Sequence, residues 1–271
     1  MDCWIFTKAI LFCMCSSRLP FLDIPVGIPY NSPMLLLRSA FGAAAWGQDQ
    51  MTNGEDFLKS KKIHPSIPRP PKRVIWLPML VLVWNQLTYQ GAFLLAAGRD
   101  HHSLALALDR AIPLVPWTIS IYFGCFAFWA VHYIWIAWEG GSLARRFFGA
   151  DILTKGIGFV IFLVFPTVMA RPEITGSGFW NEAMRFLYWL DQPYNLFPSI
   201  HCAISWLCWD SVRGNERFPR WYRVLTFVCG VAVCISTLTT RQHVLADILG
   251  GIALAEICWH LTPRLFAKTD K

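Results

Sequence analysis

Apolar residues dominate six stretches of the chain, at 74–97, 114–138, 152–170, 198–212, 221–240 and 243–261. A helix needs about 20 apolar residues to cross the hydrocarbon core of a bilayer. The stretch 198–212 is the shortest and carries Ser199, His201 and Ser205, but we still expect it to cross. Backbone groups at that depth must satisfy their hydrogen bonds inside helices. The pattern therefore predicts an all-α polytopic membrane protein, a bundle of six transmembrane helices.

Composition and charge extend this prediction to topology. Hydrophobic residues make up 55% of the chain and charged residues 15%, which favours a membrane protein. Short cytoplasmic segments carry the excess of Lys and Arg. If both termini are cytoplasmic, sixteen Lys and Arg from Lys59 onward lie inside, and five lie outside: Arg99, Arg110, Arg171, Arg185 and Arg241. We expect a multi-pass protein of the plasma membrane with this topology, which explains the net charge of +7 without a nucleic-acid partner.

The sequence predicts four parts of the chain, of which three lie outside the helix bundle. Residues 1–50 are expected to form a poorly defined extension, or else to precede the true start at Met51. Residues 51–73 are expected to be a basic cytoplasmic leader, 74–262 the six-helix membrane domain and 263–271 a short cytoplasmic tail.

Two distant segments each place a histidine at the mouth of a predicted span. His201 opens the fourth span and His243 opens the sixth, and both spans enter from the outer side, so the two residues lie at one depth. Burying a polar titratable group there costs about 2 kcal/mol or more, so such groups usually serve a substrate, an ion or a proton. The pair therefore marks a candidate site on the outer face.

His243 is followed four residues later by Asp247, on the same helix face. The carboxylate can hold one imidazole nitrogen and leave the other free as a nucleophile. Such pairs also occur in purely structural roles, so the catalytic interpretation depends on the second segment.

That second segment predicts a phosphate site beside His201. Pro198 suits the first turn of a helix, whose unpaired N–H groups, together with the Ser199 hydroxyl, can bind an anion. Arg171 and Arg241 lie on the same side and offer planar guanidinium groups to phosphate oxygens. The combination indicates phosphoryl chemistry.

The run Pro198-Ser-Ile-His201, with Ser236 followed by His243 and Asp247, resembles the motifs of the type 2 phosphatidic acid phosphatase superfamily, over roughly residues 114–261. The resemblance implies a six-helix bundle with its site on the non-cytoplasmic face. It also implies that His243 forms a phosphohistidine, that Asp247 assists it and that His201 protonates the leaving group. We expect no metal or other cofactor, because arginines and helix-end donors would supply the charge.

Two positions depart from the family pattern. The first motif has a lysine seven residues before its Arg-Pro pair, where this chain has Val164, and the third motif's arginine is replaced by Thr237, with Arg241 one turn further on. Together with Phe165-Pro-Thr167 and Gly250-Gly251, these departures make the motifs most similar to those of the branch that contains inositol phosphorylceramide synthases. In that branch, transfer to an alcohol competes with hydrolysis.

The sequence thus predicts a membrane lipid phosphatase or phosphotransferase, surrounded by membrane lipids, that acts on a lipid phosphate, pyrophosphate or phosphodiester. The alternative is a non-catalytic lipid-binding or transport protein of the same fold, which Val164 and Thr237 favour. The aromatic outer segment 179–190 is expected in the headgroup layer, as an interfacial anchor or as a lid.

Overall fold

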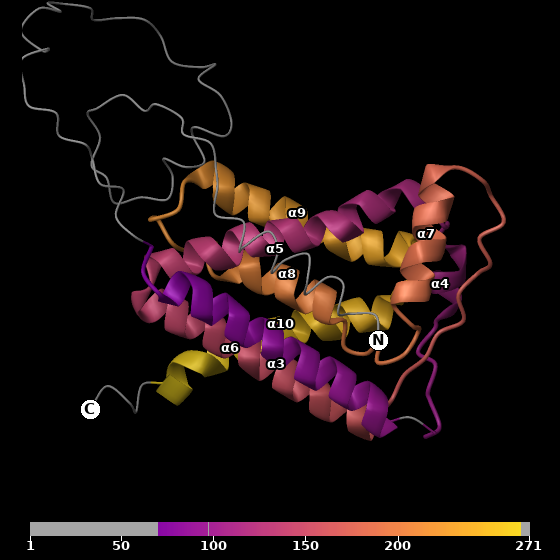
Figure 1. The fold of residues 1–271 in the computed structure, drawn as a ribbon, viewed down its shortest axis with the longest axis horizontal. Coiled ribbons are helices and arrows are strands. Elements are labelled where there is room, and N and C mark those ends of the chain that lie inside the picture. The colour runs from indigo at the N-terminus through magenta and orange to yellow at the C-terminus, as the bar shows by residue number, and fades with distance from the viewer. Residues whose placement is uncertain (1–69, 97, 267–271) are drawn as a thin grey trace, which may run out of the picture.

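The computed structural model describes residues 70–96 and 98–266, which form a bundle of helices (Figure 1). The helices, labelled as in the figure, are α3 (Arg73–Ala96), α4 (Ala107–Ala111), η2 (Pro116–Thr118), α5 (Ile119–Glu139), α6 (Gly141–Val164), α7 (Phe179–Leu190), α8 (Ile200–Asp210), α9 (Arg220–Thr239) and α10 (Leu245–Phe266). The predicted extension 1–50, the leader up to residue 69 and the tail from residue 267 lie outside the described residues. The helix α10 runs into the predicted tail, as far as Phe266.

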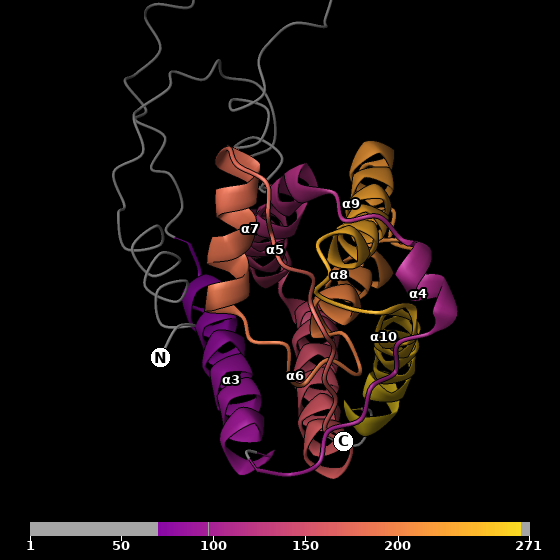
Figure 2. The same ribbon diagram turned by 90° about the vertical axis from the view of Figure 1, so that its right-hand side faces the viewer.

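The short helix α8 occupies the centre of the bundle. It packs against α9 and α10 and also contacts α6 and α5, while α3 lies against α6 and α5. The amphipathic helix α7 crosses one end of the bundle, where α4 also lies (Figures 1 and 2). The same end carries the irregular segments that enter the candidate site.

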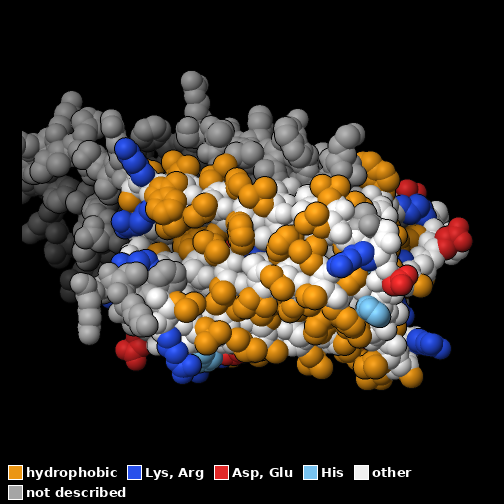
Figure 3. Space-filling model, turned by 90° about the horizontal axis from the view of Figure 1, so that it is seen from below, with side chains coloured by type: hydrophobic (Ala, Val, Ile, Leu, Met, Phe, Trp, Pro, Cys, Tyr) orange, Lys and Arg blue, Asp and Glu red, His pale blue; other side chains and the backbone are white. Residues whose placement is uncertain are grey.

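Five of the described helices, α3, η2 with α5, α6, α9 and α10, are long and apolar enough to cross a membrane. Exposed Leu, Val and Phe side chains line the outside of this bundle, and Figure 3 shows them covering its length between two charged ends. The all-α polytopic class is therefore confirmed. The count of six spans stays a prediction, because α8 has only 11 residues.

The helix α6 begins eleven residues before the predicted third span, at Gly141 instead of residue 152. Its early turns hold charged residues, so the hydropathy pattern placed the start of the helix too late. Lys155 is one of the sixteen Lys and Arg residues that the predicted topology assigns to the cytoplasmic side. It lies inside α6 and forms a buried ion pair with Asp151 at 2.9 Å. Asp151 also accepts a hydrogen bond of 2.7 Å from Tyr133 of α5. Buried charges persist when they are paired in this way, and here they join two helices.

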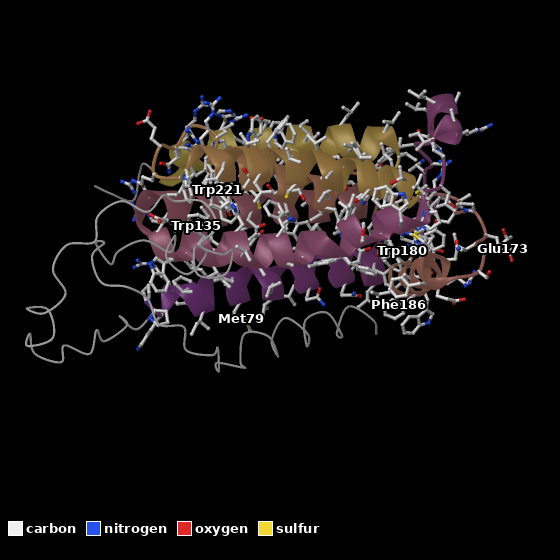
Figure 4. All side chains as sticks on the ribbon, turned by 90° about the horizontal axis from the view of Figure 1, so that it is seen from above. Met79, Trp135, Glu173, Trp180, Phe186 and Trp221 are labelled. Carbon is white, nitrogen blue, oxygen red and sulfur yellow. The ribbon has the colours of Figure 1, made fainter. Side chains whose placement is uncertain are left out.

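The helix α7 matches the segment 179–190 that the sequence placed in the headgroup layer. Met184 and Leu187 are buried against the bundle, whereas Phe179, Trp180 and Trp189 are exposed. Figure 4 shows Trp180 and Phe186 at this end of the molecule and Trp135 and Trp221 towards the opposite end. An amphipathic helix across the bundle end suits a membrane interface.

Candidate active site

An irregular segment, residues 191–199, leads from α7 into α8. Thr167, in the loop after α6, holds this segment in place. Its hydroxyl oxygen accepts hydrogen bonds of 2.9 Å from the N–H groups of Leu196 and Phe197, and its carbonyl oxygen accepts one of 3.1 Å from Asn195. Non-helical backbone at membrane depth is tolerated where the protein itself supplies its hydrogen bonds. The segment can therefore deliver the start of α8 to a fixed position.

The start of α8 and the first two turns of α10 approach so closely that a side chain would not fit between them at Gly251. A Cβ atom on Gly251 would lie 2.4 Å from the carbonyl oxygen of Ser199. The Ser199 N–H donates to the carbonyl oxygen of Asp247 at 2.9 Å, which links the two helices directly. Gly251, singled out above only as part of a motif, thus allows the backbone contact that brings His201 beside His243.

The structure places His243 and Asp247 in contact. Nδ1 of His243 lies 3.3 Å from Oδ2 of Asp247, and the same oxygen accepts a hydrogen bond of 3.0 Å from the N–H of Val244. His243 lies two residues before α10, and burial there lowers its pKa, but the hydrogen bond and the charge of Asp247 outweigh this, so the net pKa of His243 is raised above 6.5. Because Nδ1 faces Asp247, the Nε2 atom of His243 is the ring nitrogen that can contact a substrate.

His201 faces His243 from α8, with 6.0 Å between the two ring centroids. Its ring packs against Tyr122, Phe126 and Trp129, at centroid distances of 4.8, 6.0 and 5.6 Å. These aromatic residues are four and three positions apart and so share one face of α5. The rings hold the imidazole of His201 beside His243 with an apolar wall behind it.

Ser199 does not lie inside the first turn of a helix, as the sequence suggested for the Pro198 segment. It is the N-cap of α8, and its hydroxyl oxygen accepts a hydrogen bond of 3.3 Å from the N–H of Cys202. Ser199 is fully buried. Its hydroxyl therefore stabilises the helix start, and a phosphate role would have to share that oxygen with the cap.

Arg171 lies next to the histidines through its contact with Gln242. Its Nη2 atom donates to Oε1 of Gln242 at 2.6 Å, and its Nη1 atom donates to the carbonyl oxygen of Asp191. The guanidinium carbon is 4.9 Å from the ring centroid of Tyr188 on α7. Because Gln242 directly precedes His243, Arg171 joins α7, the segment after it and the His243 turn.

Arg241 has a similar bracing position. It adopts a φ of 54° in the turn before His243. Its Nη1 atom donates to the carbonyl oxygen of Asp109 at 2.6 Å, and its Nη2 atom donates to that of Ile112. Burial raises the pKa of Tyr188 to about 12, against the opposing charges of Arg171 and Arg241, so both arginines lie near this hydroxyl group.

Asp191 is a functional candidate that the sequence analysis missed. Its carboxylate accepts hydrogen bonds from Tyr89 at 2.8 Å and from Tyr122 at 3.4 Å, and its negative charge acts on both His201 and His243. No local spacing could reveal this carboxylate, because its partners come from α3 and α5. An acidic residue directly after an aromatic outer segment was the only available clue.

The two departures from the family pattern have different surroundings. Val164 is 74% exposed at the end of α6, so its side chain lies on the outside of the protein. Thr237 is buried, and its hydroxyl donates to the carbonyl oxygen of Cys234 at 2.8 Å. Within residues 70–96 and 98–266, no three His, Cys, Asp or Glu side chains are grouped so that they could hold a metal ion.

The chain was compared with curated proteins, with solved structures and with models of protein families. No curated protein and no solved structure matches the chain significantly. A family model described as the PAP2 superfamily matches residues 99–261, which is more than half of the chain and includes both histidine segments. The likeness to the inositol phosphorylceramide synthase branch stays a prediction. On the strength of this match and of the residues that it covers, the chain belongs to the PAP2 superfamily.

Proposed function

We propose that the protein is a lipid phosphatase or phosphotransferase that works through a phosphohistidine at His243, on the outer face of the membrane. Membership of the PAP2 superfamily indicates a phosphatase-type enzyme that acts on lipid phosphates. The observation that carries the finer proposal is the placement of His243, tied to Asp247, with its ring centroid 6.0 Å from that of His201. One tetrahedral phosphorus group can contact both rings at this separation.

In the first half-reaction, Nε2 of His243 attacks the phosphorus of a lipid phosphate, pyrophosphate or phosphodiester. A P–N bond forms, the P–O bond to the leaving group breaks, and His201 donates a proton to the departing oxygen. Asp247 stabilises the positive charge that develops on the imidazole of His243. In the second half-reaction, water or an alcohol transfers a proton to His201 and attacks phosphorus, and the P–N bond breaks.

In this mechanism, N–H donors of the protein bind the phosphate oxygens and balance their negative charge, without a metal ion. Nε of Arg171, Nε of Arg241 and Nε2 of Gln242 are buried N–H donors without a hydrogen-bond partner in the described part of the chain. Buried donors are nearly always paired in native proteins, and phosphate oxygens are strong acceptors for them. Arg171 lies in the loop after α6, and Arg241 and Gln242 lie in the connection between α9 and α10 that also carries His243.

The alternative, a non-catalytic lipid-binding or transport protein, is favoured by the contacts of the two arginines. The Nη atoms of Arg171 and Arg241 already donate to loop carbonyl oxygens and to Gln242. Fewer charged donors are then directed at a transferring phosphoryl group. Turnover decides between the two functions.

A turnover assay on the purified full-length protein tests the proposal. Phosphatidic acid, a diacylglycerol pyrophosphate and a polyprenyl pyrophosphate are each supplied with and without an alcohol acceptor. Released phosphate indicates a phosphatase, and a phosphorylated alcohol indicates a transferase. Lipid binding without either product from any substrate would contradict the proposal and support the non-catalytic alternative.

A pH profile gives a second prediction. We expect kcat/KM to fall as the pH decreases through a midpoint above 6.5, because the pKa of His243 in the free protein is raised and only the neutral imidazole attacks. Asp247→Asn removes the charge that raises this pKa, so the midpoint moves to lower pH while the maximal rate falls. Glu216→Gln, an exposed carboxylate between α8 and α9, is the control. An unchanged midpoint in Asp247→Asn would show that Asp247 does not set the titration.

A further inference from the structure

A cavity lies at the opposite end of the bundle from the two histidines. It has a volume of about 690 Å³, and its wall includes Arg145, Arg146, Arg213 and Arg217. The wall is built from the start of α6, the connection between α8 and α9, and the last turns of α10. Figure 4 shows side-chain nitrogens gathered at this end, near Trp221. The cavity shares no residue with the candidate active site.

Two of these arginines are held in defined positions. The guanidinium carbon of Arg146 lies 3.7 Å from the ring centroid of Trp259, and its Nε and Nη2 atoms donate to the carbonyl oxygen of Trp259 at 3.2 and 3.1 Å. Arg213 donates to both carboxylate oxygens of Glu256 at 2.9 Å and lies 3.2 Å from Oδ1 of Asp210. These contacts fix two of the four guanidinium groups of the cavity wall in position.

The charge of the pocket is positive after these pairs are counted. Among the described residues, Asp210 is the only carboxylate in the wall, and Glu256 pairs with Arg213 from outside the wall, so the four arginines outnumber these two acidic groups. Both acidic groups contact Arg213, and within the described residues no carboxylate forms an ion pair with Arg146 or Arg217. Guanidinium groups bind phosphate oxygens through paired N–H donors. The chemistry of the pocket thus suits a phosphate-bearing anion.

The surroundings favour a lipid as the source of that phosphate. Leu261 and Leu265, on α10 beside the pocket, are 36% and 58% exposed and can contact acyl chains. The charge distribution predicts that this end is cytoplasmic, where anionic lipids are enriched and basic pockets between helices bind their headgroups. We propose that the pocket binds the phosphate headgroup of an anionic glycerophospholipid, at a site separate from the one that performs catalysis.

The pocket is tested by titrating the purified full-length protein with phosphatidylglycerol and with phosphatidylcholine, and counting bound lipids by native mass spectrometry. The variant is Arg145→Gln with Arg146→Gln. Each removed arginine is expected to weaken phosphatidylglycerol binding about fivefold, so the pair weakens it roughly 25-fold. Phosphatidylcholine, which has no net charge, should bind more weakly to the wild type and respond little to the substitutions.

The matched control is Arg220→Gln with Arg264→Gln, which removes the same charge from exposed positions at the same end, outside the pocket wall. Equal losses in the two double variants would overturn the pocket in favour of general surface electrostatics, as would equal affinity for the two lipids. Inorganic phosphate is titrated as a competitor. Displacement of phosphatidylglycerol only at high phosphate concentration supports a lipid ligand, whereas tighter binding of phosphate than of lipid overturns that assignment. Thermal unfolding of each variant verifies that it is folded.

Discussion

His243→Ala is expected to reduce turnover of the lipid phosphate substrate by about 1000-fold or more, and to abolish labelling of the protein by a ³²P-labelled substrate. The imidazole is the proposed acceptor of the phosphoryl group, and its Nδ1 atom is held 3.3 Å from Asp247. An alanine leaves no nucleophile at this position, whereas the remaining donors can still bind substrate. KM should therefore change much less than kcat. Acid-labile label on the wild-type protein, trapped by rapid quenching in base, is the direct measurement.

Two comparison variants give this experiment its specificity. His260→Ala removes a histidine that is exposed on α10 at the other end of the bundle, and it should leave turnover unchanged. His201→Ala keeps the nucleophile but removes the proton donor, so a substrate with an acidic leaving group, such as a nitrophenyl phosphate ester, should still label the protein. Turnover that survives in His243→Ala would show that the nucleophile lies elsewhere.

Gly251→Ala is expected to lower kcat by about 100-fold, although the substitution adds only a methyl group and touches no reacting atom. Its Cβ atom would lie 2.4 Å from the carbonyl oxygen of Ser199 and 3.3 Å from the N–H nitrogen of Ala203. Both are backbone atoms, so no side-chain rotation relieves the clash, and α8 must move away from α10. The movement separates His201 from His243. Single-turnover kinetics should locate the loss in the chemical step.

Gly124→Ala is the matched control, because Gly124 is exposed on α5 and a Cβ atom there would contact nothing within 4 Å. Alanine is favoured over glycine inside a helix by about 1 kcal/mol, so this variant should be at least as stable and fully active. Normal activity in Gly251→Ala would mean that the contact between α8 and α10 does not position the histidines.

The long helices α3, α5 and α9 could be predicted from the sequence because their apolar residues are nearly continuous. The segment 179–190 was identified with the bounds that α7 has in the structure, since its aromatic and polar residues stand out between two loops. The contact between His243 and Asp247 was predicted from helical spacing, although His243 lies two residues before α10 and Asp247 contacts it from the first turn of that helix. Each of these inferences uses only residues that are close together in the chain.

The remaining features depend on contacts between distant segments. Asp151 and Lys155 form an ion pair inside α6, and a hydropathy pattern contains no information about such pairing. The helix α8 begins only at Ile200, after a non-helical segment that Thr167 stabilises from a different loop. Asp191 gains its position from Tyr89 and Tyr122 on two other helices. No local pattern records such partners, so these parts of the site required the folded structure.

The loops around the site are joined largely through main-chain atoms. Arg171 and Arg241 donate to the carbonyl oxygens of Asp191, Asp109 and Ile112, and the Thr167 hydroxyl accepts from two backbone N–H groups. Every residue type has a carbonyl group, and every type except proline has an N–H group. Evolution can therefore replace many of the contacted side chains without losing these bonds, whereas the arginines and Thr167 must stay. Related enzymes could share this loop architecture and yet show little sequence identity in the loops themselves.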